Sequence, residues 1–321
     1  MNVVYSIKSN HTCTFLGVCI NIVSCDKIEI TTIMGVQSMS NPVVIMTDST
    51  ADLSLELLKK YQIISVPLYV HFGEKYFKDG LEITTPELYA RVEQEKVLPQ
   101  TAAPSPGDFI DVFRPLVSDG KDIVYIGIGS NLSATLQSAR VAASEFPENR
   151  IYIVDSKNLS SGIALLVLKA KDLRNQGLSA PEIFEKINAL VPKVRSQFAI
   201  QTLEYLYKGG RATGLQALMG SLLRIKPIIK VTDGKLGVYK KAFGKMSRAL
   251  DIMLEDYVSL GDQVDLDYVM ITHSLADKHA TYMIDYVNTH LKPKQLIESH
   301  AGCVISSHCG EGTIGILYIE R

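Results

Sequence analysis

Short apolar runs alternate with amphipathic segments along most of the chain. The apolar runs are rich in β-branched residues, have the length of buried parallel strands, and span residues 43–46, 123–128 and 151–154. The amphipathic segments carry apolar residues at helical spacing, and they include 134–146, 160–175 and 180–191. Because strands and helices alternate from Val43 to about Arg195, the pattern predicts a parallel sheet with helices on both faces.

Predicted strands and helices also alternate in the second half of the chain. Together with the length of 321 residues, this pattern favours an α/β fold of two α/β domains, the first with a mainly parallel sheet. The predicted strands here are 197–200, 225–231 and 268–272, and the predicted helices are 215–223, 247–258 and 276–291. Pro227 predicts an edge position or a bulge, and Thr232–Lys235 predicts a hairpin turn. The segment Val304–Tyr318 is interpreted as two short strands around His308.

A strand changes into a helix within a few residues at Gly129–Ser133, and again at Thr47–Asp52. The first N–H groups of a helix lack intrahelical partners and carry a partial positive charge. The hydroxyls of Ser130, Ser133 and Thr135 add donors, so this turn could hold a carboxylate or a phosphate, although ordinary helix capping is the more common explanation for a single junction of this kind. If the two strands are neighbours, both turns face the same crevice.

Residues 1–42 do not resemble the rest of the chain. The apolar run Thr14–Val23 is short, contains Gly17 and Asn21, and has the features of neither a membrane-spanning helix nor a signal peptide. We interpret residues 1–42 as an extension that is disordered or a mis-annotated start, with Met39 directly before the first strand.

The composition favours a cytoplasmic globular protein. The formal net charge of -1 gives no basic field for nucleic acid, and the five cysteines form no CxxC pair, so neither a disulfide framework nor a zinc site is expected. Nucleotide-binding, zincin and GxSxG patterns are absent from the sequence. Binding is therefore the leading class of function. A binder of phosphorylated small molecules, or a hydrolase using Ser130 or Ser133 with His308 as base, remains an alternative.

Three motifs resemble successive motifs of the DegV family of fatty-acid-binding proteins, and they are Asp48–Leu53, Gln100–Ser105 and Ser130–Ser138. Further matches extend the resemblance over Val43–Arg321, and they are Asp155–Lys157, Leu203–Arg211, Gly220–Pro227, Asp233–Lys235 and Ile305–Gly315. The chain departs from the family pattern in places. The family usually has Thr-Ser-Gln-Pro at Thr101–Pro104, glycine at Ala134, proline at Glu311 and a basic residue near Phe243.

The resemblance implies a long-chain fatty acid, such as palmitate or oleate, buried between an N-terminal domain (43–195) and a C-terminal domain (196–321). The first domain would carry the carboxylate site, and the second would close over the acyl chain. The implied ligand-binding residues are Thr101, Ser130, Asn131, Ser133 and His308. Arg211 would contact a separate fatty acid kinase catalytic subunit, which phosphorylates the bound acid. The chain itself would have no catalytic residues, metal, cofactor or integral membrane segment.

Overall fold

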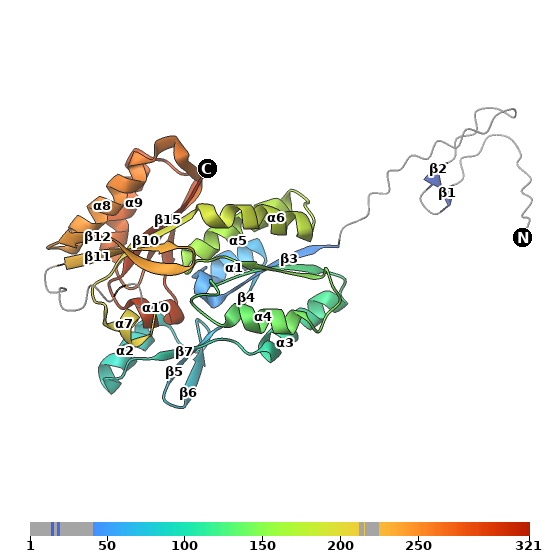
Figure 1. Ribbon diagram of the computed structural model, residues 1–321, viewed down its shortest axis with the longest axis horizontal. Coiled ribbons are helices and arrows are strands. Elements are labelled where there is room, and N and C mark those ends of the chain that lie inside the picture. The colour runs from blue at the N-terminus through green and yellow to red at the C-terminus, as the bar shows by residue number, and fades with distance from the viewer. Residues whose placement is uncertain (1–13, 16–17, 20–40, 212–214, 216–224) are drawn as a thin grey trace, which may run out of the picture. The chain divides into compact units, whose positions relative to one another are not determined.

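The computed structural model describes residues 14–15, 18–19, 41–211, 215 and 225–321. Residues Asn41–Arg321 form one compact unit (Figure 1). Before it, β1 (Thr14–Phe15) pairs antiparallel with β2 (Val18–Cys19). Most of the extension 1–42, and nearly all of the predicted helix 215–223, lie outside the described residues.

A four-stranded sheet forms the centre of the first half, with the strand order β4-β3-β8-β9. Its strands are β3 (Val43–Asp48), β4 (Ile63–Val66), β8 (Asp122–Gly127) and β9 (Ile151–Asp155). All three pairings are parallel, which confirms the prediction from the alternating pattern. Every residue of β8 is buried, because the strand lies in the interior of the sheet with helices on both faces.

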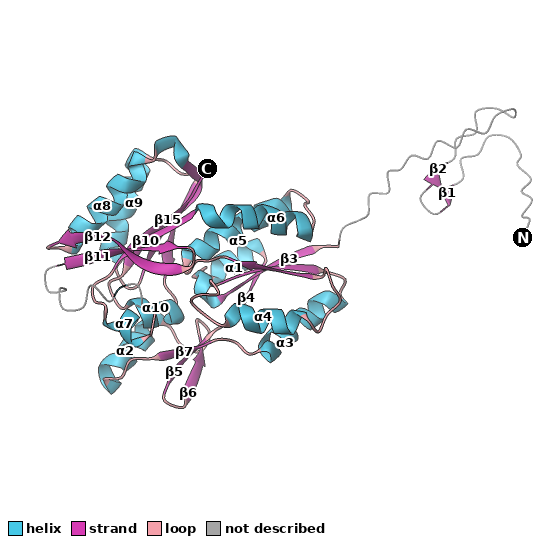
Figure 2. Cartoon of the chain, viewed as in Figure 1, coloured by secondary structure: helices cyan, strands magenta, loops and turns pink. Residues whose placement is uncertain are grey.

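Helices cover both faces of this parallel sheet (Figure 2). One face packs on α3 (Pro106–Ser118) and α4 (Thr135–Ala143). The other packs on α1 (Leu55–Tyr61), α5 (Ser161–Asn175) and α6 (Ala180–Leu190). The 3-10 helix η1 (Ser49–Ala51) follows β3 directly, and a second one, η2 (Val191–Lys193), follows α6.

A six-stranded sheet forms the centre of the second half, with the order β12-β11-β10-β15-β13-β14. Its strands are β10 (Val194–Ala199), β11 (Ile225–Thr232), β12 (Lys235–Phe243), β13 (Val264–His273), β14 (Gln295–His300) and β15 (Ile314–Glu320). Only the β13–β14 pairing in this sheet is parallel. One face is covered by α8 (Met246–Ser259) and α9 (Asp277–His290), with η4 (Gly261–Gln263) after α8.

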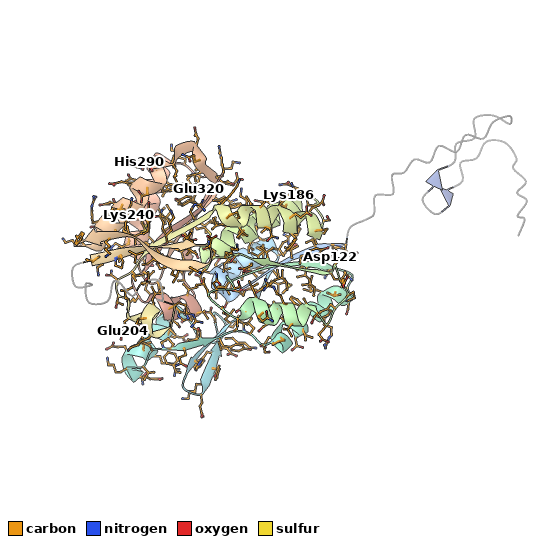
Figure 3. All side chains as sticks on the ribbon, in the orientation of Figure 1. Asp122, Lys186, Glu204, Lys240, His290 and Glu320 are labelled. Atoms are coloured by element: carbon orange, nitrogen blue, oxygen red, sulfur yellow. The ribbon has the colours of Figure 1, made fainter. Side chains whose placement is uncertain are left out.

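Helix α5 joins the two halves because it packs against both sheets. Residues Ile163–Leu168 of this helix are fully buried and share one core with Met270 of β13 and Leu317 of β15. Side chains from both sheets fill the space between the elements (Figure 3). The helix thereby fixes the position of the first sheet relative to the second.

A small antiparallel sheet, with the order β6-β5-β7, interrupts the predicted pattern of the first half. The predicted strand 63–72 is divided at Pro67 into β4 and β5 (Tyr69–Phe72), and β6 (Lys75–Lys78) pairs with β5. The predicted loop 99–107 contains β7 (Gln100–Ala102). Helix α2 (Thr85–Glu95) begins with Pro86 in its first turn, as predicted.

The prediction of two strands in Val304–Tyr318 is wrong for its first part. Residues Cys303–Cys309 form helix α10, and β15 follows. Carboxylates far away in sequence accept the first N–H groups of this helix, since Gly302 N donates to Asp52 Oδ1 (2.8 Å) and Cys303 N donates to Asp79 Oδ1 (2.7 Å). Helix α7 (Glu204–Lys208) packs beside α10.

The β11–β12 hairpin confirms two local predictions. Asp233 and Gly234 have φ angles of 48° and 74°, as a two-residue hairpin turn requires. The pairing register shifts between Ile228 and Ile229, so the strand that contains Pro227 has a bulge while lying inside the sheet.

A protein that begins at Met39 is expected to fold as stably as the full chain. The reason is that Asn41–Arg321 is one compact unit whose first strand, β3, starts at Val43. Urea unfolding of the two proteins should give the same midpoint and the same slope. A midpoint lowered in the shorter protein would show that the extension contributes to the fold.

Candidate functional site

A cavity of about 300 Å³ lies between the two halves of the compact unit. Large apolar side chains from both halves line it, and they are Leu68, Ile128, Leu132, Leu159, Phe198, Leu206, Leu236, Val304, Ile305 and Leu317. The volume is at the lower end of the range for small-molecule sites. A mainly apolar ligand of modest width fits this lining.

Five polar side chains line the interior of the cavity, and each has a partner within the protein. The contacts are Ser160 with Asp52, Thr272 with Ser161, Ser274 with Tyr89, Thr313 with the Cys309 carbonyl, and His273 with Glu298. Buried polar groups that are already paired add little cost when apolar surface covers them. The interior can therefore accommodate an apolar ligand segment.

Thr101, Ser133, Arg211 and His308 form a group of polar residues in the lining, which we call the polar end. Thr101 Oγ1 lies 2.9 Å from His308 Nε2, although the two residues are 207 positions apart. The pairing of β7 with β5 positions Thr101, and the capping of α10 by Asp52 and Asp79 positions His308.

The imidazole of His308 is neutral at neutral pH. Burial and, to a smaller extent, the positive charge of Arg211 lower its pKa to about 4. Its Nδ1 faces Gly209, and a Cβ atom at Gly209 would lie 2.2 Å from it. Nδ1 is buried and has no hydrogen-bond partner among the described residues. If the ring proton is on Nε2, it donates to Thr101 Oγ1, and the Thr101 hydroxyl can then donate to an anion in the cavity.

Arg211, for which the sequence predicted a contact with a kinase subunit, lines the cavity at the polar end. Its Nη1 donates to the Gly209 carbonyl (2.6 Å) and its Nε to the Leu132 carbonyl (3.2 Å). These contacts join the segment after α7 to the turn before α4. Among the described residues, no carboxylate forms an ion pair with it, so its charge is available to an anionic ligand or partner.

Ser130 and Asn131 face a neighbouring hollow, while Ser133 and Arg211 line both this hollow and the cavity. The Ser130 hydroxyl donates to Asp155 Oδ2 (2.5 Å), and its N–H donates to Asp155 Oδ1 (3.2 Å). Asn131 Nδ2 donates to the Asp233 carbonyl (3.2 Å). The structure thus brings Thr101, Ser133 and His308 together and directs the Ser130 and Asn131 side chains to other partners.

The side chain of Asp48 organises the turn that leads to the polar end. It accepts hydrogen bonds from Ile128 N (3.0 Å), the Tyr125 hydroxyl (2.8 Å), Thr50 N (3.1 Å) and the Thr50 hydroxyl. Burial raises its pKa, and these hydrogen bonds oppose that shift. Asp48 connects the ends of the neighbouring strands β3 and β8. The turn Gly129–Ser133 lines the cavity, whereas Ser49 and Asp52 of the other turn line a separate hollow, so the prediction that both turns face one crevice is wrong.

A hydrolase that pairs Ser130 or Ser133 with His308 is not supported by the hydrogen bonds of the described residues. Ser133 Oγ bonds Thr135 Oγ1 (2.8 Å), whereas His308 bonds Thr101. One group of possible metal ligands, His273, Asp277 and His300, has its donor atoms within 4.8 Å of one another. However, His273 Nδ1 already accepts the Ala276 N–H (3.0 Å), and its Nε2 bonds Glu298 (3.1 Å), so a metal would break a helix cap.

His308 is expected to make the protein less stable as the pH falls from about 6.5 to about 4. Its folded-state pKa of about 4 is below the ordinary value of 6.5, so the unfolded chain binds the proton first and stability rises with pH in this window. This difference between the folded-state and unfolded-state pKa corresponds to a change in the free energy of unfolding on the order of 3 kcal/mol. Urea unfolding at both ends of the window should show a smaller pH dependence for His308→Gln; an unchanged dependence would contradict the assignment.

The fold and the site together define an α/β binding protein with a mainly apolar cavity and one polar end. A family model described as "Uncharacterised protein, DegV family" matches residues 42–321. The chain belongs to the DegV family. A DegV domain-containing protein of Caldanaerobacter subterraneus subsp. tengcongensis is 31% identical over 279 residues, which cover 87% of this chain and 99% of that protein.

Two solved structures extend the comparison. A fatty-acid-binding DegV family protein from Thermus thermophilus has a TM-score of 0.81 at 30% identity, covering 87% of this chain and 100% of that one. A stearic-acid-binding protein from Eubacterium ventriosum has a TM-score of 0.78 at 28% identity, covering 86% and 97%. Among the residues described for this chain, every helix is too short or too polar to cross a membrane.

Proposed function

We propose that this chain binds one long-chain fatty acid, such as palmitate or oleate, with the carboxylate at the polar end and the acyl chain in the cavity. The carrying observation is the division of the lining. Most of the lining is apolar, whereas Thr101, Ser133 and Arg211 place hydroxyl and guanidinium groups together beside His308. The fatty acid binding of the Thermus thermophilus and Eubacterium ventriosum relatives supports this proposal.

The energetics favour such a ligand. Palmitate has about fourteen methylenes, and at roughly 0.8 kcal/mol each their burial gives on the order of 11 kcal/mol before the cost of association. This gain offsets a partly desolvated carboxylate only when the carboxylate is hydrogen-bonded. Thr101 and Ser133 would donate to it, His308 would orient the Thr101 hydroxyl, and Arg211 would supply positive charge.

The binding of the fatty acid carboxylate by Ser130 and Asn131 stays a prediction. Either would first have to release its present acceptor, since Ser130 donates to Asp155 and Asn131 to the Asp233 carbonyl. The division into a carboxylate-binding domain (43–195) and a closing domain (196–321) is likewise proposed, and the lining of the cavity by both halves supports it.

Extraction of the purified protein tests the fatty-acid proposal. Organic solvent should release about one fatty acid per chain, and protein stripped of lipid should take up added palmitate or oleate in native mass spectrometry. A phosphorylated metabolite in place of the lipid would favour the alternative binder. Protein that contains no lipid and takes up neither acid would refute the proposal.

We further propose that the protein is a carrier in the cytoplasm, non-catalytic in phosphoryl transfer, that presents its fatty acid to a separate ATP-dependent kinase. Protein loaded with palmitate, the kinase, ATP and magnesium should together form an acyl phosphate, which hydroxylamine traps as a hydroxamate. Omission of either protein should abolish the product. Product formation by this chain alone would contradict the carrier role.

Arg211→Glu is expected to lower the yield of acyl phosphate at least tenfold, because a charge contact with the kinase would be reversed. Since Arg211 also lines the polar end, the assay requires palmitate at saturation, measured separately for the variant. Lys186→Glu, a reversal of a cation that lies outside the cavity, is the matched control. Equal yields from Arg211→Glu and the parent at saturation would place the kinase contact elsewhere.

A further inference from the structure

One serine that lines the cavity has an unusual backbone conformation. Ser160 lies between β9 and α5 with φ 53° and ψ −144°, a region that side-chain-bearing residues rarely adopt. Its side chain is 5% exposed and lines the interior of the cavity. Residues held in such conformations concentrate at sites where the position of a side chain matters for chemistry.

The hydroxyl of Ser160 donates to a buried carboxylate. Its acceptor is Oδ2 of Asp52, a residue that is 6% exposed at the end of η1. The other oxygen, Oδ1, accepts the Gly302 N–H at 2.8 Å, and this bond fixes the orientation of the carboxylate. Burial and the nearby Asp79 and Asp48 raise the pKa of Asp52, which makes it a stronger base than an ordinary aspartate.

The backbone around Ser160 forms a strand-turn-helix junction of the kind that presents nucleophilic serines. Ser160 directly precedes the 15-residue helix α5, and the N–H of Ser161 is the first of that helix. Gly162 has no room for a side chain, because a Cβ atom there would lie 2.2 Å from Asn158 Oδ1 and 2.6 Å from Ser196 Oγ. A serine followed two residues later by a tightly packed glycine is half of the GxSxG pattern, with Asn158 in the position of the first glycine.

We propose that Ser160 is a nucleophile toward carboxylic esters whose apolar acyl chain occupies the cavity, with Asp52 as its general base. This pair differs from the serines that the sequence singled out, Ser130 and Ser133, which lie at the other junction. The reaction needs only the cavity, and it does not depend on the presentation of a fatty acid to a kinase.

The chemical steps balance with water as the second substrate. Ser160 Oγ attacks the ester carbonyl while its proton moves to Asp52, and the N–H of Ser161 can donate to the oxyanion that forms. The carbon–oxygen bond to the alcohol then breaks, and Asp52 returns the proton to the leaving alkoxide. Water then attacks the acyl-serine ester while its proton moves to Asp52. The bond between the acyl carbon and Ser160 Oγ breaks, Asp52 returns the proton to Oγ, and the fatty acid is released.

A fluorophosphonate with a dodecyl chain tests this assignment on the full-length protein. The folded protein should gain one adduct per chain, and peptide mass spectrometry should locate it on Ser160. Excess palmitate should slow the labelling, and unfolding in urea should abolish it. Labelling should also slow on acidification, because a protonated Asp52 cannot accept the serine proton. A folded protein that gains no adduct, or gains it on another serine, overturns the proposal and leaves Ser160 as a structural contact between the two halves.

Two variants separate reactivity from structure. Asp52→Asn should reduce the labelling rate on the order of 100-fold, as expected when a general base is lost, and Ser160→Ala should abolish the adduct. An unchanged rate in a folded Asp52→Asn protein overturns the role of Asp52. If either variant fails to fold, the site of labelling in the parent protein decides the matter. Palmitate uptake, measured in parallel, shows whether a negative result concerns Ser160 alone or fatty acid binding as well.

Discussion

Replacing Asp48 with alanine is expected to lower the free energy of unfolding by about 3–5 kcal/mol. The carboxylate is fully buried and accepts hydrogen bonds from the Tyr125 hydroxyl and Ile128 N, both of which would lose their acceptor. An unsatisfied buried donor costs about 1–3 kcal/mol, and two of them account for most of the effect. The turn after β8 should also lose its fixed position, so palmitate binding should weaken.

Equilibrium unfolding in urea measures this loss, with Asp111→Ala as the control. Asp111 is an exposed aspartate of α3, and its replacement should change stability by less than about 0.5 kcal/mol. If Asp48→Ala is as stable as the control, Asp48 is not the residue that connects the ends of β3 and β8.

Gly209→Ala is expected to weaken palmitate binding at least tenfold, which corresponds to about 1.4 kcal/mol. The new Cβ atom would lie 2.2 Å from His308 Nδ1 and 3.0 Å from the Tyr205 carbonyl, so His308 must move away from Thr101. The Thr101 hydroxyl would then lose the partner that orients it. Overpacking of this kind also lowers stability, typically by about 1–3 kcal/mol.

The neighbouring glycine provides the matched control. Gly210 has a φ angle of 71°, but no atom of the described residues lies within 4 Å of a Cβ placed there. Gly210→Ala should therefore cost about 1–2 kcal/mol of stability through backbone strain while leaving His308 in place. Titration with palmitate should show weaker binding in Gly209→Ala only. Equal affinities in the two variants would show that the contact between Gly209 and His308 is unimportant for the ligand.

The first half of the fold could be predicted because its signals are local. Apolar runs and capping residues specify β3, β8, β9 and the helices after them. The second half was less predictable at α10, where Val304, Ile305 and Ser306 have low helix propensity. This helix depends on Asp52 and Asp79, more than 200 residues away, which accept its first N–H groups. Such tertiary capping leaves no local pattern in the sequence.

The residues of the site could be predicted from the sequence better than the geometry in which they are arranged. The resemblance singled out Thr101, Ser133 and His308, which meet at the polar end. It did not reveal that the Ser130 hydroxyl donates a hydrogen bond to Asp155, or that Arg211 lines the cavity. Asp155 is the last residue of β9 and precedes a turn, and a carboxylate at the end of a parallel strand was the available signal.

The most direct test of the account is an NMR titration with palmitate labelled with ¹³C at the carboxyl carbon. We predict one bound carboxyl resonance per chain. Its chemical shift should remain that of an ionised carboxylate at pH values where free palmitate is protonated, because donors at the polar end stabilise the carboxylate. Thr101→Val should shift that resonance and weaken binding. A labelled carboxyl that gives no bound resonance, or one that is unaffected by Thr101→Val, would contradict the placement of a fatty acid carboxylate at the polar end.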